Sequence, residues 1–419
     1  MAGPVLHRLP NGLSVVAAGQ PGAAVAVNVT YRVGSRDESP ERTGIAHLFE
    51  HLMFEGSAGV AAGEHFACLE RYGAWLNGFT MIDRTTYFET VPRGVLPLAL
   101  WLEADRMRSL GTALNQRSLD TQREVVKNEW RESCNQPYGT AVERLQARLF
   151  PSGHAYAHSP IGDMAHLDAM DLAGFRRFLA RHYAPDRAVV TVVGAADPEA
   201  AVEEVTRCFA DIAPSGHEPS AAYRAQLAPL PDPIRETCRE PVPMTALYRL
   251  WRLPGDGTAD CDSAEMALHI LAGGPGSRLQ ARLVRGERSA VGVSGWVHRL
   301  AGTSMGLLAV QLPGDGSAAA VEEAVDEEIA SLAVTGPDED EVSRAATALE
   351  LAALREMSTC DGHADALAQA TLQFGEPGRA YRRATAWRAV SGDAVAKIAA
   401  TWLGPEHCAQ LTYLPEEAS

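Results

Sequence analysis

The amino-acid sequence predicts an α+β fold with two similar domains, each a mostly antiparallel β-sheet packed with helices. The length of 419 residues suits two domains of about 200 residues each. Proline and glycine residues interrupt the hydrophobic periodicity at 212–237, and the segments on either side repeat one order of strand, helix, strands and paired helices. We therefore expect domains at 1–213 and 238–419, joined by a linker at 214–237.

The first half begins with a hairpin, because residues 5–9 and 13–18 flank Pro10-Asn-Gly12, a strong turn signal. Valines alternate along a strand at 24–33, and a run rich in Thr, Tyr, Phe and Val predicts another at 85–91. N-cap chemistry at Ser118-Leu-Asp120 announces a long helix at 121–132. The remaining elements expected in this half are helices at 44–56, 61–72, 96–108, 141–150 and 171–182 and a buried strand at 188–193.

The second half repeats this order without a clear repeat of residue identities. We expect a strand at 244–253, a helix at 262–272, strands at 291–297 and 305–312, and helices at 317–334, at 338–357 and onward to about 402. The order favours a duplicated domain.

The composition is that of an ordinary soluble globular protein, with 46% hydrophobic and 21% charged residues. The net charge of −16 argues against nucleic acid as the main partner. The seven cysteines are scattered without a Cys-x-x-Cys pair, which favours a reducing compartment and argues against a thiolate zinc site. The first residues lack the basic and apolar pattern of a leader, and no run reaches about 18 apolar residues, so we expect a cytoplasmic protein without a membrane span.

One helix carries the residues with the clearest chemistry. His47, Glu50 and His51 are spaced so that they share a face of the helix at 44–56. Two imidazoles one turn apart can bind one tetrahedral zinc ion, and a carboxylate between them can accept a proton from activated water. The order His-x-x-Glu-His is that of inverzincin metalloproteases. The alternative is that these histidines are packed core residues.

A hydrolytic zinc ion has three protein ligands as a rule, and Glu129 is the best third candidate. On its helix, Glu129 shares a face with Val125 and Val126, beside apolar positions. Glu132, one turn further, could share that face, whereas Glu124 points elsewhere. A surface role for all three glutamates is the alternative.

The chain resembles the pitrilysin-type inverzincin metallopeptidases, the family of the mitochondrial processing peptidase β-subunit and of small bacterial two-chain zinc peptidases. Five separated motifs match in order, so the resemblance covers nearly the whole chain. They are 34–56, with Gly34-Ser-Arg-Asp-Glu-Ser-Pro40 and His47-Leu-Phe-Glu50-His51; Asn77-Gly-Phe-Thr80-x-x-Asp83-x-Thr85-x-Tyr87; the Glu129 helix; His158-Ser-Pro-Ile-Gly162; and Gly273-Gly-x-x-Ser277-Arg278-Leu279.

The resemblance implies one Zn²⁺ per chain, held in the first domain by His47, His51 and Glu129, with Glu50 as the catalytic base. The second domain would have the same fold without metal ligands. The resemblance also implies that an extended peptide pairs with an edge strand, so that the substrate-binding residues are Asn77, Gly78, Phe79 and Thr80. Turn and strand-start roles are the alternative for Asn77 and Thr80.

The sequence departs from the family pattern at two positions. Gln122 stands seven residues before the third ligand, where a glutamate is frequent; we expect it to support the metal ligands from outside. Family members that bind substrate through the second domain carry an Arg and, seven residues later, a Tyr; here Arg285 is present and Gly292 replaces the tyrosine.

We therefore expect a zinc endopeptidase subunit that cuts extended peptides in a chamber formed with a second chain. The partner would be a metal-free homologue that supplies the Arg/Tyr substrate clamp, with a homodimer as the alternative. The rival functions are a maturation protease dedicated to one precursor peptide and a non-catalytic assembly subunit.

Overall fold

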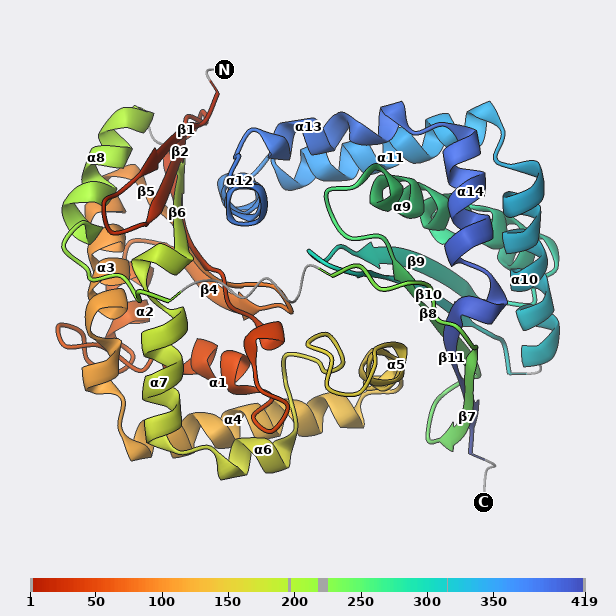
Figure 1. Cartoon of the computed structure of the whole chain (residues 1–419), viewed down its shortest axis with the longest axis horizontal. Coiled ribbons are helices and arrows are strands. Elements are labelled where there is room, and N and C mark those ends of the chain that lie inside the picture. The colour runs from red at the N-terminus through yellow and green to blue at the C-terminus, as the bar shows by residue number, and fades with distance from the viewer. Residues whose placement is uncertain (1–2, 195–196, 218–224, 315, 417–419) are drawn as a thin grey trace. The chain divides into compact units, whose positions relative to one another are not determined.

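The computed structural model describes residues 3–194, 197–217, 225–314 and 316–416, which form two compact units (Figure 1). Unit 1 comprises Met1–Glu129, Ser159–Pro219 and Ala352–Arg383, and unit 2 comprises Trp130–His158, Ser220–Leu351 and Ala384–Ser419. Relative to the contiguous domains expected from the sequence, residues 130–158 belong to unit 2 and residues 352–383 to unit 1. Within the expected linker, 218–224 lie outside the described residues and a strand begins at Ile234.

Unit 1 contains a six-stranded sheet in the order β1-β2-β6-β3-β5-β4. β2 and β6 pair in parallel, and the other neighbours pair antiparallel. This order leaves β4 at one edge of the sheet. The strands are β1 (Val5–Arg8), β2 (Ser14–Ala18), β3 (Ala24–Tyr31), β4 (Trp75–Thr80), β5 (Thr85–Pro92) and β6 (Ala188–Val193).

Both faces of this sheet are covered by helices, because successive residues of a strand point to opposite faces. Val15 and Ala17 of β2 belong to the main core with Leu100 of α3, whereas Val16 and Ala18 pack with α12. The helices that lie wholly within unit 1 are α1 (Ile45–Leu52), α2 (Glu64–Glu70), α3 (Leu96–Ala113), α6 (Met164–Ala169), α7 (Leu172–His182), α8 (Pro198–Phe209) and α12 (Cys360–Phe374).

Unit 2 contains a five-stranded sheet in the order β7-β11-β8-β10-β9, with β7 and β11 parallel and the other neighbours antiparallel. This repeats the order β2-β6-β3-β5-β4 of unit 1, directions included, so the prediction of two similar, mostly antiparallel α+β domains is confirmed. The strands are β7 (Ile234–Glu240), β8 (Ala246–Leu253), β9 (Gly292–His298), β10 (Ser304–Gln311) and β11 (Cys408–Pro415).

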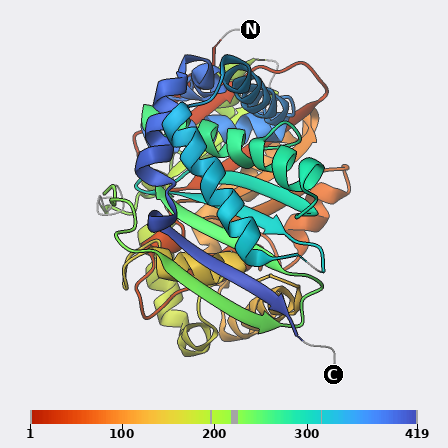
Figure 2. The same ribbon diagram turned by 90° about the vertical axis from the view of Figure 1, so that its right-hand side faces the viewer.

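Helices also pack on the sheet of unit 2, where α5 contacts β8 and β11 while α9 contacts β9 and β10 (Figure 2). The helices wholly within this unit are α5 (Ala141–Leu149), α9 (Ala259–Ala272), the π-helix Gln280–Gly286, α10 (Ala318–Thr335) and α14 (Gly392–Trp402). The helices that pass from one unit to the other are α4 (Gln116–Asn135), α11 (Glu339–Glu356) and α13 (Arg379–Ala386). The short 3-10 turns are Ser35–Asp37, Arg93–Val95, Pro185–Arg187, Trp387–Ala389 and Pro405–His407.

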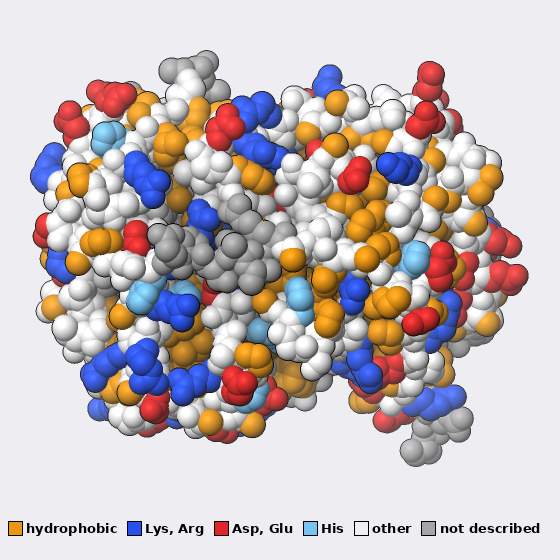
Figure 3. Space-filling model, viewed as in Figure 1, with side chains coloured by type: hydrophobic (Ala, Val, Ile, Leu, Met, Phe, Trp, Pro, Cys, Tyr) orange, Lys and Arg blue, Asp and Glu red, His pale blue; other side chains and the backbone are white. Residues whose placement is uncertain are grey.

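Among the described residues, no helix combines the length and apolar content that a membrane crossing requires. Acidic and basic side chains are interspersed over the face shown in Figure 3, so the net charge of −16 is not gathered into one patch on that face.

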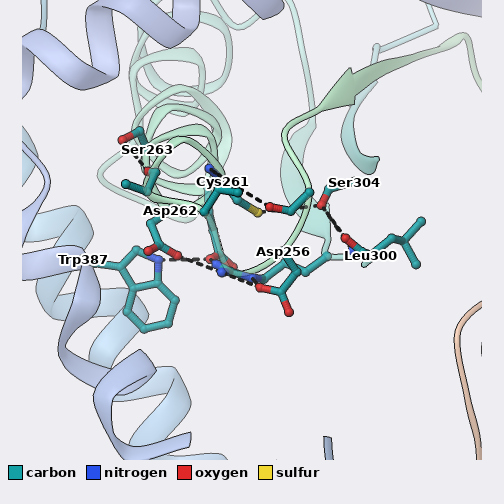
Figure 4. A network of polar contacts seen from close by, with 12 residues as sticks. Asp256, Cys261, Asp262, Ser263, Leu300, Ser304 and Trp387 are labelled. Atoms are coloured by element: carbon teal, nitrogen blue, oxygen red, sulfur yellow. Dashed lines mark hydrogen bonds and ion pairs between the residues drawn. The ribbon is translucent and has the colours of Figure 1, made fainter. Parts of the chain in front are cut away.

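Along the chain, α1 lies between β3 and β4 of unit 1, and α9 lies between the corresponding strands β8 and β9 of unit 2. The acidic residues of α9 bind a buried arginine: Arg299 contacts Asp262 at 2.8 Å and Glu265 at 2.7 Å, and Asp256 at 2.7 Å (Figure 4). Trp387 donates a hydrogen bond to Glu265. Asp262 and Glu265 of α9 are therefore already occupied by ion pairs.

Candidate metal centre

The helix that carries the histidines is fixed at its first turn by a carboxylate from the preceding loop. α1 begins after Gly44, whose φ of +92° lies in the left-handed region that favours glycine. Glu38 accepts hydrogen bonds from the backbone N–H groups of Gly44 and Ala46, both at 2.8 Å. A carboxylate at a helix N-terminus satisfies otherwise unpaired donors and interacts favourably with the helix dipole.

A close backbone approach holds the same turn. A Cβ atom on Gly162 would lie 2.3 Å from the backbone nitrogen of Gly44, so this contact requires glycine at 162. The sequence presents Glu38 and Gly162 within motifs but gives no sign of these roles, which depend on contacts between distant segments.

The apolar face of α1 is buried and sets the direction of its polar side chains. Leu48, Phe49 and Leu52 are fully buried, and the ring of Phe49 stacks on that of Tyr183 at 4.2 Å between centroids. His47 and His51 remain partly accessible, with side-chain exposures of 13% and 22%. The packing of one face therefore leaves the two imidazoles on an accessible side.

Glu129 of α4 brings a third donor to these imidazoles. Its Oε2 atom lies 3.7 Å from Nε2 of His47 and 3.6 Å from Nε2 of His51, and one donor atom from each residue lies within 4.8 Å of the others. Ligands of a tetrahedral zinc ion are about 3.3–3.5 Å apart, given Zn–N and Zn–O bonds of about 2.0–2.2 Å. The donor set fits zinc in chemistry and in spacing.

The other glutamates of α4 are placed differently. Glu124 pairs with Lys127 at 3.2 Å, and Glu132 is exposed and does not belong to the metal-binding group found among the described residues. Of the three glutamates that the sequence left open, the structure brings Glu129 to the histidines.

Glu50 lies beside the metal group and is held by the edge strand. The hydroxyl of Thr80 donates a hydrogen bond of 2.6 Å to Oε2 of Glu50. Two residues earlier on β4, a Cβ atom on Gly78 would lie 3.3 Å from Cγ of Glu50 and 3.1 Å from the ring of Tyr87. Gly78 and Thr80 thus face Glu50, and the absent side chain at 78 permits the close approach.

The two carboxylates of the site have opposite environments. Burial raises the pKa of Glu50, partly offset by its hydrogen bond with Thr80. The neighbouring His51 imidazole, whose Nε2 atom lies 3.6 Å from Oε2 of Glu129, lowers the pKa of Glu129. Burial lowers the pKa of His47 to about 4. Burial also lowers the pKa of His51, but polar contacts with Glu129 and Gln122 and the charge of Glu50 outweigh burial and raise the pKa overall.

The other predicted site residues lie nearby in different roles. Gln122 is hydrogen-bonded with His51 and donates to Glu55 at 2.6 Å, so it contacts a metal-ligand candidate from outside. Asn77 is exposed, and its side chain accepts a hydrogen bond from the backbone of Gly78. The ring of Phe79 lies under the guanidinium of Arg84. By strand alternation, Asn77 and Phe79 point to the face opposite Gly78 and Thr80.

In unit 2, Arg285 and Gly292 stand at the two positions where the resemblance implies an Arg/Tyr pair. Arg285 donates a hydrogen bond to the carbonyl oxygen of Pro275. Gly292 begins β9, and the nearest atom that a Cβ there would meet is Oε1 of Gln311 at 3.7 Å. The position could hold a side chain but carries none.

Comparisons with known proteins agree with this architecture. A model of the insulinase family of peptidases (M16) matches residues 14–158, which include His47, Glu50, His51 and Glu129. A model described as the M16 inactive domain matches residues 169–349.

Among curated relatives, a zinc protease of Helicobacter pylori is 35% identical over 44% of this chain and 42% of its own length. An uncharacterised zinc protease of Mycobacterium tuberculosis is 29% identical over 66% of this chain and 64% of its own length. The mitochondrial-processing peptidase β-subunit of Blastocladiella emersonii is 29% identical over 45% of this chain and 40% of its own length. Each match spans less than two thirds of the relative's own length.

Solved structures are similar over nearly the whole chain. A protease from Helicobacter pylori superposes with a TM-score of 0.91 at 22% identity, covering 99% of both chains. An M16 inactive-domain protein from Pseudomonas fluorescens superposes with a TM-score of 0.87 at 17% identity, covering 100% of this chain and 99% of its own. These likenesses show the fold.

Proposed function

Because the chain belongs to peptidase family M16, we propose that it is a zinc-dependent endopeptidase subunit that hydrolyses extended peptides. One observation carries the proposal: three donor atoms with the spacing of zinc ligands converge beside Glu50. Curated relatives named zinc proteases support the same chemistry.

His47, His51 and Glu129 would hold the metal. When bound, zinc lowers the pKa of a coordinated water and polarises a carbonyl group. Glu50 accepts the proton of the attacking water and delivers it to the amine that leaves when the peptide bond breaks. Thr80 fixes the carboxylate of Glu50 for both transfers through its hydrogen bond.

The edge strand β4 would bind the peptide. One side of β4 pairs with β5, which leaves the backbone groups of 77–80 on its other side free to pair with an extended substrate. A peptide bound there lies next to the strand that holds Glu50. Recognition through backbone groups supports a broad range of peptide sequences.

A second chain would complete the substrate site within a shared chamber. The absence of a tyrosine at 292 supports a metal-free homologue that supplies the Arg/Tyr clamp, with a homodimer as the alternative. The β-subunit named among the relatives supports an assembly of more than one chain. The scattered cysteines support a cytoplasmic location as part of the same proposal.

Two glutamates of α4 provide the test. We expect Glu129→Ala to lower the zinc content of the purified protein and its hydrolysis of an unstructured reporter peptide, because a ligand is lost. Glu132→Ala, one turn away and exposed, should retain both. Zinc is measured by plasma mass spectrometry and cleavage by chromatography. Equal zinc in the two variants, or full cleavage by Glu129→Ala, would contradict the proposal.

A further inference from the structure

A second group of metal-ligand side chains lies in the interior of unit 1. It consists of His65 on α2, Glu89 on β5 and Glu103 on α3, and one donor atom from each lies within 4.8 Å of the others. Their exposures are 3%, 1% and 0%. Three elements distant in sequence thus direct ligand-type side chains to one buried point.

Each of the three side chains has one buried atom without a hydrogen-bond partner among the described residues. These atoms are Nε2 of His65, Oε1 of Glu89 and Oε1 of Glu103. Nε2 of His65 lies 3.6 Å from Oε1 of Glu103, which is too long for a hydrogen bond but is close to the spacing of two ligands on one zinc ion. Buried polar atoms in folded proteins are almost always partnered, so this convergence points to a bound group.

Arg106 fixes the carboxylate of Glu103 by contacts with both of its oxygens. Its Nε and Nη2 atoms donate to Oε2 at 3.0 and 2.6 Å. Nη2 also forms an ion pair with Oε1 at 2.5 Å, although this contact is not a hydrogen bond. Metal-binding carboxylates are commonly oriented by such outer contacts. The guanidinium lies 4.3 Å from the ring of Tyr87, which encloses the group.

The charges of this group can accommodate a metal ion in place of a proton. Burial and the neighbouring Glu103 raise the pKa of Glu89 well above its usual value, so a proton on Glu89 balances the buried charge when no metal ion is bound, and a metal ion would displace that proton. His65 distinguishes these possibilities, because a proton shared by the carboxylates would leave Nε2 without a partner. Burial lowers the pKa of His65 well below its usual value, which keeps the imidazole in the neutral form that binds metals.

We propose that His65, Glu89 and Glu103 form a second, structural metal site that takes a divalent transition-metal ion such as Zn²⁺. A nitrogen ligand disfavours the alkali and alkaline-earth ions, which prefer oxygen. The ion would connect α2, β5 and α3 behind the catalytic helix, where Phe54, just past the end of α1, contacts the ring of His65. This site is independent of the catalytic proposal, since it shares no ligand with His47, His51 and Glu129.

Metal counting tests the proposal. We expect two zinc ions per chain in the wild-type protein, after zinc loading and dialysis, and one in the His47→Ala/His51→Ala double variant. Plasma mass spectrometry and native mass spectrometry give the stoichiometry. One ion in the wild type and none in the double variant would overturn the second site whether or not the chain is a peptidase.

Variants of the buried group locate the second ion. In the double-variant background, His65→Gln should lower the zinc content from one ion to none, while His182→Gln, at another buried histidine of unit 1, should leave it unchanged. Circular dichroism checks that each variant folds. Retention of the ion by a folded His65→Gln protein would overturn the proposal.

A stability measurement covers the case in which His65→Gln does not fold. A chelator should lower the melting temperature of the double variant by about 5–10 °C, because an ion bound to the folded state stabilises it. An unchanged melting temperature after chelation would overturn the proposal. So would Glu89→Gln if it raised the melting temperature without changing the metal content, since that result identifies a shared proton as the buried cation.

Discussion

At the scale of the residue, the candidate catalytic centre separates a ligand from a base by their surroundings. Glu129 is about half exposed, and the neighbouring His51 imidazole lowers its pKa, so the carboxylate stays ionised. Glu50 is largely buried, and burial raises its pKa, which favours the uptake of a proton. The same functional group thus suits two tasks.

Thr80 positions the base. We expect Thr80→Val to lower kcat roughly 10–100-fold with little change in KM, because Glu50 loses a hydrogen bond to a charged group worth about 1.5–3 kcal/mol. Zinc content should stay at the wild-type level. Thr80→Ser restores the hydroxyl and should recover most of the rate; a serine variant as slow as the valine variant would argue against this role.

The sequence predicted part of the arrangement of the candidate metal centre. Helical spacing placed His47, Glu50 and His51 on one face and selected Glu129, because those arguments need only the periodicity of one helix. The bond from Thr80 to Glu50 depends on how β4 packs against α1. Substrate pairing by the backbone of Thr80 stays a prediction, and the structure adds a partner for its hydroxyl within the chain.

At the scale of the element, α1 is too short to be stable by itself. Its eight residues fall below the length at which an isolated helix persists in water, so its position depends on tertiary contacts. Glu38 at its first turn and the close approach of Gly44 and Gly162 supply these contacts.

Removal of the Glu38 carboxylate, which caps α1, should loosen this helix. We expect Glu38→Ala to lower the free energy of unfolding by about 1–3 kcal/mol, because two backbone N–H groups of a buried turn lose their acceptor. Zinc affinity should fall as well. Glu41→Ala, at an exposed position of the same loop, serves as the control. Urea unfolding measures the difference, and equal stability of the two variants would remove Glu38 from this role.

Periodicity and caps predicted most of the elements near the site, and the exceptions have local causes. α4 begins at Gln116 rather than 121, because Asn115 and Ser118 form reciprocal hydrogen bonds at its start. β7 begins within the expected linker, because four of its seven residues are charged (Arg235, Glu236, Arg239 and Glu240), as is common for an edge strand. β4 lies at the edge where the resemblance places peptide binding.

At the scale of the whole molecule, the two sheets repeat one topology while only unit 1 carries converging His and Glu donors among the described residues. The sequence predicted the repeat from the order of its elements. It could not predict that 130–158 and 352–383 belong to the other unit, because hydrophobic periodicity reports burial and not the neighbour that provides it.

The missing tyrosine at 292 leads to a prediction for the assembly. We expect a metal-free homologous chain to co-purify with this one and to raise peptide hydrolysis roughly 10–100-fold, because hydrogen bonds to the substrate backbone are gained. Affinity purification followed by mass spectrometry identifies the partner, and recombination of separately purified chains measures the gain. Full activity of this chain as a monomer would refute the two-chain arrangement.

The variant Glu50→Gln tests the central claim most directly, because it removes the base and leaves all three metal-ligand candidates in place. Zinc content and hydrolysis of an unstructured peptide are measured on the same preparation. We predict wild-type zinc content and hydrolysis reduced by roughly 10²–10⁴-fold. Normal cleavage by the zinc-loaded variant would contradict the assignment of Glu50 as the catalytic base.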